Sequence, residues 1–285
     1  MSSLTPKVSY VLTSYNFADT IRESLDCIFN DAADYCELIY RDDCSSDGTY
    51  ESAVSYLNEK KKSRFLNVSH YRNSENEGAS ANISKAISEA QGEYVRIIAG
   101  DDFISPGSTG KLMEFSKREN KKACIGHARF IKEGQTGISK PMEFLRPNRI
   151  FRTIFPNMSV DDFFFRTLFF WDLRGSVLLI ENSFLRHLGG ISSSEALEDW
   201  DLLIRVSFEQ QLGYYPGAVA TVTTRSREVE LAKSLDRIEW TFETLDRHRD
   251  KIKKRFGLSF WILYSKFHCY KYLLYIYRFF GRVHK

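Results

Sequence analysis

The chain has little of what marks a secreted, zinc-bound or membrane-spanning protein. Its five cysteines are odd in number and scattered, with no CxxC pair, which argues against a disulfide framework and against zinc. The first residues lack the basic and apolar segments of a signal peptide. The most apolar long stretch, residues 258–280, contains Lys266, His268, Lys271 and Arg278, so it is too charged to span a bilayer. We therefore expect a cytoplasmic protein.

Neither sign of charge is in large excess. The formal net charge is +3, and charged residues make up 27% of the chain, an ordinary value for a globular protein. This balance gives no reason to expect a nucleic acid as partner. The basic residues gather late in the chain, between residues 247 and 285.

Apolar runs alternate with segments of helical spacing from Val8 to Phe130. The predicted strands are residues 8–13, 38–40, 65–71 and 94–99, and helices are predicted at residues 21–29, 49–59 and 78–90. Such alternation predicts an α/β fold, Rossmann-like, with a mostly parallel sheet and helices on both faces.

After Phe130 this rhythm breaks. Residues 131–158 are typical of a loop, and the later segments read as an aromatic helix at 160–171, a short strand at 177–180 and a helix at 195–209. Beyond Arg227 the pattern is helical and basic. We expect a main domain at residues 1–227, with halves 1–130 and 131–227, and a helical extension at 228–285.

Three pairs of adjacent acids stand at turns far apart in the chain: Asp42-Asp43, Asp101-Asp102 and Glu198-Asp199. The first two follow predicted strands, and the third begins a run with helical spacing. Carboxylates at such places face the ligand crevice of α/β folds, where they can hold a metal, act as a base or hold a proton.

The first two pairs can each be interpreted in more than one way. Asp42 and Asp43 are typical of turn chemistry before a helix, or Asp43 accepts hydrogen bonds from a nucleobase or ribose. Asp101 and Asp102 repel each other unless a cation or strong donors neutralise them. Because Mg²⁺ and Mn²⁺ prefer oxygen ligands and often combine one or two carboxylates with substrate phosphates, we favour a metal at the second pair.

The third pair lies on a predicted helix. Asp199 is spaced to share the buried face of that helix with Leu202, Leu203 and Val206, so it is either a buried structural carboxylate or a base in a partly apolar pocket. We expect Asp201 and Arg205, four residues apart, to form a pair on the surface.

Taken together, these residues resemble the family 2 glycosyltransferases, inverting enzymes with the GT-A fold, of the type that builds bacterial surface polysaccharides. The resemblance covers roughly residues 7–225. The matching segments, in order, are Val8–Asn16, Asp42–Thr49, Asn76–Gly78 with Ala81-Asn82, Gly92–Tyr94, Asp101-Asp102 with Pro106, and Glu198–Leu202 with Arg205. Residues 1–130 would then bind a nucleotide-sugar, and 131–227 would face the acceptor.

The resemblance implies roles for the donor side of the site. Thr13, Tyr15 and Asp43 would hold the base and ribose of a nucleotide-diphospho-sugar, which we expect to be a UDP-sugar. Asp101 would contact the nucleotide and bind Mn²⁺ or Mg²⁺, with Asp102 beside it as a second metal ligand.

On the acceptor side, the resemblance implies that Asp199 is the catalytic base and that Glu198 and Trp200 lie near the acceptor, a glycan or lipid-linked hydroxyl. The sequence departs from the family pattern in three places. Ala99 stands where a first acid is usual, Cys44 replaces a common glycine, and Arg225–Arg227 replaces the late Arg-x-His.

Two other functions remain open at this point. A nucleotidyltransferase of similar fold would carry a glycine-rich phosphate loop with a basic residue after the first strand, and Ser14–Phe17 offers neither. A catalytically inactive sugar-nucleotide-binding protein is favoured by Ala99 and opposed by Asp101, Asp102 and Asp199.

The end of the chain carries one apolar stripe at helical spacing, bordered by basic residues. The stripe consists of Phe260, Leu263, Phe267, Tyr270, Leu274 and Tyr277, and the basic border of Lys271, Arg278, Arg282 and Lys285. Such a pattern is typical of a helix in a membrane interface, so we expect peripheral membrane contact through residues 258–285. Packing on the main domain, or on a second copy in a homodimer, is the alternative.

Overall fold

The computed structural model describes residues 7–32, 34–60, 64–132, 175–192, 197–224, 234–258, 261–262, 264–269 and 271–272. The chain divides into two compact units, one formed by residues 1–160 and 173–224 and the other by residues 161–172 and 225–285. The domain limits set out above stay a prediction.

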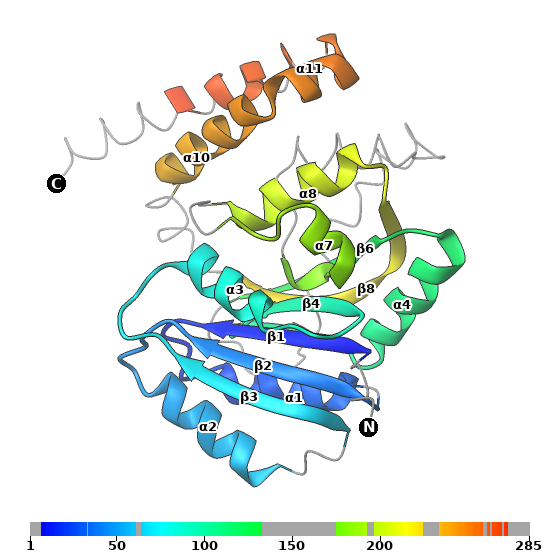
Figure 1. The fold of residues 1–285 in the computed structure, drawn as a ribbon. Helices are drawn as coiled ribbons and strands as arrows, with labels where there is room; N and C mark the ends of the chain where they lie inside the picture. The colour runs from blue at the N-terminus through cyan, green and yellow to red at the C-terminus, as the bar shows by residue number, and fades with distance from the viewer. Residues whose placement is uncertain are drawn as a thin grey trace, which may run out of the picture. The chain divides into compact units, whose positions relative to one another are not determined.

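An eight-stranded sheet with the order β3-β2-β1-β4-β7-β6-β8-β5 is the centre of the first unit (Figure 1). Its strands are β1 (Val8–Ser14), β2 (Cys36–Asp42), β3 (Phe65–Arg72), β4 (Tyr94–Ala99), β5 (Asp102–Ile104), β6 (Ala123–Lys132), β7 (Leu178–Glu181) and β8 (Leu212–Thr224). Four of the seven pairings are parallel, among them all those between β1, β2, β3 and β4, whereas β7 runs antiparallel to both β4 and β6. The predicted α/β fold with a mostly parallel sheet is confirmed.

Helices cover both sides of this sheet. They are α1 (Ile21–Asp31), α2 (Thr49–Glu59), α3 (Ala79–Ser88), α4 (Ser108–Glu119), α7 (Asn182–His187) and α8 (Glu198–Phe208), with a 3₁₀ turn η1 (Gly175–Val177) before β7. Figure 1 shows α1 and α2 on one side of β1–β3 and α3 on the other. The apolar spacing along α1 buries Ile21, Leu25 and Ile28, as its sequence pattern predicts.

Several predicted limits change. The helix predicted at 195–209 begins at Glu198, and Val177 belongs to η1 instead of the following strand. Residues 131 and 132 continue β6 instead of starting a loop. The rest of the predicted loop at 131–158 and the aromatic helix at 160–171 lie outside the described residues.

A buried ion pair that the sequence analysis did not predict joins several elements of the sheet. Arg96 on β4 is fully buried, lies 3.6 Å from the Asp31 carboxylate, and donates hydrogen bonds to the Ser108 hydroxyl and the Val219 carbonyl, each at 2.8 Å. Tyr10 on β1 donates to the same Asp31 at 2.9 Å, and burial, followed by the Asp31 charge, raises the pKa of Tyr10. These bonds tie α1, α4, β1, β4 and β8 together, because a buried charge is tolerated only when it is paired and hydrogen-bonded.

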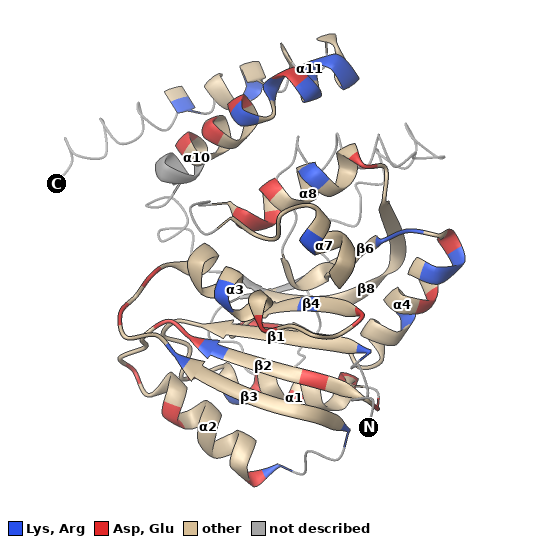
Figure 2. Cartoon of the chain, viewed as in Figure 1, with Lys and Arg blue, Asp and Glu red and all other residues tan. Residues whose placement is uncertain are grey.

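The second unit is helical, as predicted for the end of the chain, and consists of α10 (Ser234–Arg247), α11 (Arg249–Phe256) and a helical segment at the described positions from 258 to 272. Figure 2 shows charged residues along α10 and α11, in contrast to β1, which has none. Among the described residues, its buried hydrophobic side chains are Ile238, Leu245, Ile252 and Phe267. Within the described residues, no helix is long and apolar enough to cross a membrane.

The apolar stripe predicted at the end of the chain is described at one of its six residues, Phe267. This side chain is buried and contacts Phe242 of α10, with 6.5 Å between ring centroids. At Phe267 the stripe therefore faces the interior of the second unit instead of a membrane. The other five residues lie outside the described residues.

Candidate active site

The carboxyl ends of three parallel strands meet at one edge of the sheet. Ser14 of β1 lies opposite Asp42 of β2, and Thr13 lies opposite Ala99 of β4. The loops that follow these strands therefore leave the sheet side by side. In open α/β sheets, ligands bind in the crevice outside such strand ends.

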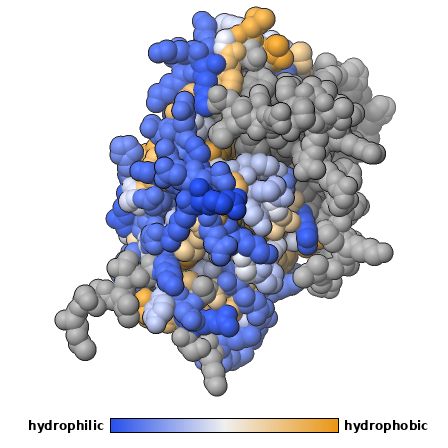
Figure 3. All heavy atoms as spheres, turned by 90° about the vertical axis from the view of Figure 1, so that its right-hand side faces the viewer, coloured by the Kyte–Doolittle hydropathy of each residue, from blue (hydrophilic) through white to orange (hydrophobic). Residues whose placement is uncertain are grey.

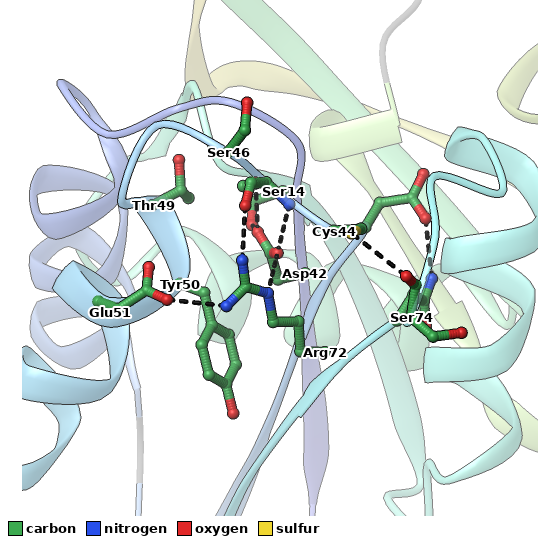
Figure 4. Close-up of polar contacts among 12 residues, drawn as sticks. Ser14, Asp42, Cys44, Ser46, Thr49, Tyr50, Glu51, Arg72 and Ser74 are labelled. Atoms are coloured by element: carbon green, nitrogen blue, oxygen red, sulfur yellow. Dashed lines mark hydrogen bonds and ion pairs between the residues drawn. The ribbon is translucent and has the colours of Figure 1, made fainter.

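Asp42 anchors the turn that follows β2 (Figure 4). Its carboxylate is fully buried and accepts hydrogen bonds from the Ser14 hydroxyl at 2.8 Å and from the backbone N–H and hydroxyl of Ser45 at 2.8 and 2.5 Å. The Arg72 guanidinium lies 3.8 Å from Asp42 and donates to Glu51 at 2.7 Å. Asp42 therefore performs the turn chemistry that its sequence context suggested.

The same turn holds the loop after β1. Three backbone N–H groups of this loop, at residues 16–18, donate hydrogen bonds of 2.7 to 3.0 Å. The acceptors are side chains between β2 and the start of α2, namely Ser45, Asp47 and Thr49. Cys44 has a φ of 62°, in the left-handed region that favours glycine, which gives a physical reason for a glycine at this position in similar sequences. Two loops at the site edge are thus held in one conformation by many bonds.

Asp43 joins this edge to the start of α3. Its carboxylate is buried and accepts hydrogen bonds from the Asn73 amide at 2.8 Å and from the backbone N–H groups of Glu77 and Gly78 at 2.9 and 2.8 Å. Thr13 is also buried, whereas the Tyr15 side chain is 43% exposed. The three residues expected to hold a nucleotide lie at one edge, two as part of its buried floor and one at its surface.

The second acid pair stands where β4 leads into β5: Asp101 lies in the turn between the strands, and Asp102 is the first residue of β5. Asp101 is partly exposed in the turn, whereas Asp102 is buried and accepts a hydrogen bond from the Ser176 hydroxyl of η1. The backbone before them is tightly packed, because a Cβ atom added to Gly100 would lie 2.9 Å from the Phe17 ring. Glycine is required here by the packing of the first loop.

The third acid pair stands at the start of α8 and touches the surroundings of the other two. The Ser80 hydroxyl of α3 donates to Glu198 at 3.4 Å, two residues after the Gly78 N–H that binds Asp43. A Cβ atom at Gly175 of η1 would lie 4.0 Å from the Asp199 Cβ, so Asp199 lies next to the turn whose Ser176 holds Asp102. The fold thus brings the three acid pairs to one region.

The electrostatics of this third pair are unusual. Burial, and then the negative charge of Asp199, raise the pKa of Glu198 to about 7 from an ordinary 4.5. Acids with perturbed pKa values in such positions are candidates for catalysis, although structural carboxylates show the same shifts. The raised pKa makes Glu198 the most chemically distinctive acid of the described site.

Three other residues of α8 are more buried than expected. Trp200, expected near the acceptor, is buried in the core. Asp201 and Arg205 are paired at 2.8 Å as predicted, but their side chains are only 5% and 19% exposed, which contradicts the expected surface position. Arg205 also donates to the carbonyls of Leu188 and Gly190, which explains its burial.

The two serines that connect the acids were not predicted as functional residues. Ser80 lies in a segment interpreted mainly as a capped helix start, and Ser176 lies where no element was predicted. Serine is common and carries no distinctive spacing, so these contacts had no sequence signal. The segment Arg225–Arg227, which replaces the late Arg-x-His, lies outside the described residues.

No group of three or more His, Cys, Asp or Glu side chains forms a metal site within the described ranges. The carboxylates that could bind a divalent cation are those of Asp101 and Asp102. Asp101 is partly exposed, and Asp102 accepts a hydrogen bond from Ser176. That donor set fits a metal shared with substrate phosphates, which supply the remaining oxygens, and does not fit an all-protein cage.

Comparisons with known proteins place the chain in a family. The family model for glycosyl transferase family 2 matches residues 9–176, more than half of the chain. The chain is 34% identical over 114 residues to the cholesterol galactosyltransferase of Borreliella burgdorferi, covering 40% of this chain and 30% of that protein. It is 33% identical over 140 residues to the poly(ribitol-phosphate) beta-glucosyltransferase of Bacillus spizizenii, covering 48% and 21%. The matches span less than half the length of these relatives.

Solved structures agree in fold. S. aureus TarS 1–349 in complex with UDP-GlcNAc has a TM-score of 0.59 at 16% identity, covering 92% of this chain and 80% of that one. The mannosyltransferase PcManGT from Pyrobaculum calidifontis, in complex with GDP-Man and Mn²⁺, has a TM-score of 0.62 at 17% identity, covering 95% and 70%. From the family match, the sheet and these likenesses together, the chain belongs to glycosyltransferase family 2 and has the GT-A fold.

Proposed function

We propose that this protein is an inverting glycosyltransferase that moves a sugar from a nucleotide-diphospho-sugar to a hydroxyl of a glycan or lipid-linked acceptor. The observation that carries the proposal is the meeting of the three acid pairs: Ser80 links Glu198 to the loop of Asp43, and η1 links Asp199 to Asp102. Family membership supports sugar transfer as the chemistry of this site.

For the donor, we propose a UDP-sugar held by Thr13, Tyr15, Asp43 and Asp101. One structural neighbour was solved with UDP-GlcNAc and another with GDP-Man, and both ligands are nucleotide-diphospho-sugars. The exposed Tyr15 ring is suited to contact a base, because aromatic rings stack on nucleobases at little cost in conformational freedom. Asp43 supports the same pocket by holding the Glu77–Gly78 backbone.

Asp101, with Asp102 beside it, is our candidate for the carboxylate ligands of Mn²⁺ or Mg²⁺. A bound divalent ion would offset the negative charge that builds on the departing diphosphate. Asp102 is positioned by Ser176, so the second carboxylate of the pair is held in place before any ligand arrives.

Asp199 is the proposed base. The acceptor hydroxyl oxygen bonds to the anomeric carbon while the bond from that carbon to the β-phosphate oxygen breaks. The hydroxyl proton passes to the Asp199 carboxylate, and the bonding electrons leave with the nucleoside diphosphate. A hydroxyl is a poor nucleophile, and a positioned base contributes roughly 10²–10⁴-fold to such a step. Glu198 and Trp200 would lie on the acceptor side, Glu198 at the site and Trp200 as its buried support.

Donor hydrolysis over a panel of sugar nucleotides, with Mn²⁺ or with excess chelator, tests this proposal. We expect one nucleotide-sugar to be hydrolysed slowly, with activity lost in chelator and restored by Mn²⁺ or Mg²⁺. Asp101→Asn should raise the Mn²⁺ concentration needed, whereas Asp19→Asn, at an exposed acid of the neighbouring loop, should not.

Three outcomes would contradict parts of the proposal. Full turnover in excess chelator rejects metal dependence. Calorimetric binding of nucleotide-sugar without any turnover supports the inactive binding protein instead. Release of pyrophosphate from a nucleoside triphosphate and a sugar phosphate supports a nucleotidyltransferase. The expected cytoplasmic location and the homodimer stay predictions.

A further inference from the structure

The helical segment after α11 has one side that packs inside the second unit. Tyr264, Phe267 and His268 contact Phe242 of α10, with ring centroids 5.2, 6.5 and 4.5 Å away, and the Lys271 ammonium lies 5.7 Å from the same ring. The spacing of these residues, three and four apart, defines one helical face. This face is already occupied by α10.

The opposite side of the same segment is apolar and exposed. Leu258, Ile262 and Tyr272 are 77%, 56% and 66% exposed, and they share a helical line with the exposed residues Ser265 and Cys269. No residue on this line is charged, whereas a helix on the surface of a soluble protein normally carries its charged residues there. We call Leu258, Ile262, Ser265, Cys269 and Tyr272 the outer stripe.

Exposed apolar residues are concentrated in this unit. Among the described residues, eight large hydrophobic side chains are exposed, and five of them, Trp240, Leu258, Trp261, Ile262 and Tyr272, belong to the second unit. Scattered exposed apolar residues need no explanation, but a contiguous group marks an interaction site. Figure 3 shows hydrophobic surface directly beside strongly hydrophilic surface in this unit, at the top of the view.

Basic residues border the outer stripe. Helix α11 has the sequence RDKIKKRF, with five basic residues and one acidic residue. The side chains of Arg249 and Lys253 lie over the ring of the exposed Trp261, 5.9 and 5.5 Å from its centroid, and Trp261 directly precedes Ile262 of the outer stripe in the chain. Figure 2 shows these positive charges along α11.

We propose that the second unit docks on an anionic lipid bilayer through the outer stripe and Trp261, with α11 facing the lipid headgroups. The apolar residues of such a face insert at the boundary between headgroups and acyl chains, and the bordering basic residues bind the anionic headgroups. Tryptophan and tyrosine favour the same boundary, because their rings are apolar and carry a polar group. A second copy of the chain fits less well, because a two-fold interface on this face would bring two basic α11 helices together. This proposal does not depend on glycosyl transfer.

Sedimentation with vesicles tests the docking face on the full chain. We expect the protein to pellet with vesicles that contain phosphatidylglycerol and to bind neutral phosphatidylcholine vesicles, or anionic vesicles in high salt, about tenfold or more weakly. Leu258→Ser combined with Ile262→Ser should weaken binding to anionic vesicles by about tenfold, because two apolar anchors are lost. Leu66→Ser removes another exposed apolar side chain, 42% exposed, from β3 of the first unit and should leave binding unchanged.

Fluorescence gives a second readout. Tryptophan emission should shift to shorter wavelength with anionic vesicles, and Trp261→Phe should remove most of that shift while the far-ultraviolet circular dichroism stays the same. Failure of the wild-type chain to bind anionic vesicles overturns the proposal, as does equal binding by the double variant. A dimer in sedimentation velocity that the double variant dissociates, without vesicle binding, assigns the face to a second copy. Donor hydrolysis is measured on the same preparation. If hydrolysis occurs but vesicle binding does not, only the membrane proposal is overturned and the proposed function stands.

Discussion

Asp42 and Asp43 are surrounded by hydrogen-bond donors, whereas Glu198 at the start of α8 accepts a long bond of 3.4 Å from Ser80 and has a pKa raised to about 7. Both are pairs of adjacent acids at turns, and both lie in the same unit. In the first pair, serine hydroxyls, an asparagine amide, backbone N–H groups and Arg72 compensate the buried charge. At Glu198, burial and the neighbouring Asp199 carboxylate disfavour the charge.

The difference indicates a division of labour. A carboxylate whose oxygens are already bonded holds loops in place, and removing it costs stability. A carboxylate in surroundings that disfavour its charge has a raised pKa and therefore a higher affinity for a proton, and a general base accepts a proton during the reaction. Asp42 is therefore a scaffolding residue in this structure. At the start of α8, burial disfavours the charge of Glu198, and the neighbouring Asp199 is our proposed base.

The largest expected effect is on turnover by Asp199→Asn. Transfer at saturating donor should fall by roughly 10²–10⁴-fold, because an amide cannot take the acceptor proton. Donor affinity by calorimetry and the urea midpoint should stay close to wild type. Glu209→Gln, at the exposed far end of the same helix, is the matched control and should turn over normally. Near wild-type transfer by Asp199→Asn would show that another group is the base.

The next largest effect is on folding by Asp42→Asn. The free energy of unfolding should fall by about 2–4 kcal/mol, because the amide presents N–H donors where Ser14 and Ser45 already donate and loses the charge beside Arg72. Urea titration measures this change. Glu51→Gln removes the exposed partner of the same Arg72 and should change stability by less than about 1 kcal/mol. An equal decrease in the free energy of unfolding for Asp42→Asn and Glu51→Gln would contradict the scaffolding role of Asp42.

The smallest effect concerns how stability depends on pH. Glu198 has an ordinary pKa of 4.5 and a folded-state pKa of about 7, so between these values the folded chain keeps a proton that the unfolded chain releases. The free energy of unfolding should therefore decrease as pH rises through this window, by about 1–3 kcal/mol. Glu198→Gln should flatten that decrease. Urea titrations at several pH values compare the two slopes, and parallel curves would mean that Glu198 titrates normally.

Local signals were sufficient to predict the first half of the fold. The helix at Thr49–Glu59 and the strand at Tyr94–Ala99 have the limits expected from sequence, because each combines a regular apolar pattern with a glycine or acid turn at its end. β8 was not predicted, because it pairs with β6 and β5, strands about ninety or more residues earlier in the chain.

The site could be predicted only in part. Motif order identified the acids that the fold brings together, although their roles stay predictions. The contacts between them were not predictable, since Ser80 and Glu198 are 118 residues apart and Ser176 and Asp102 are 74 apart. Arg96 was overlooked for the same reason: its position in an apolar strand makes sense only once Asp31 of α1 is beside it.

The anomeric configuration of the first transfer product tests the proposed single displacement most directly. A base that takes the acceptor proton in a single displacement requires the sugar to change configuration at its anomeric carbon. Nuclear magnetic resonance of the product, formed from a donor of known configuration and observed before any spontaneous equilibration, measures this. The account predicts inversion. Retention of the donor configuration would contradict a single displacement and would assign Asp199 a different role.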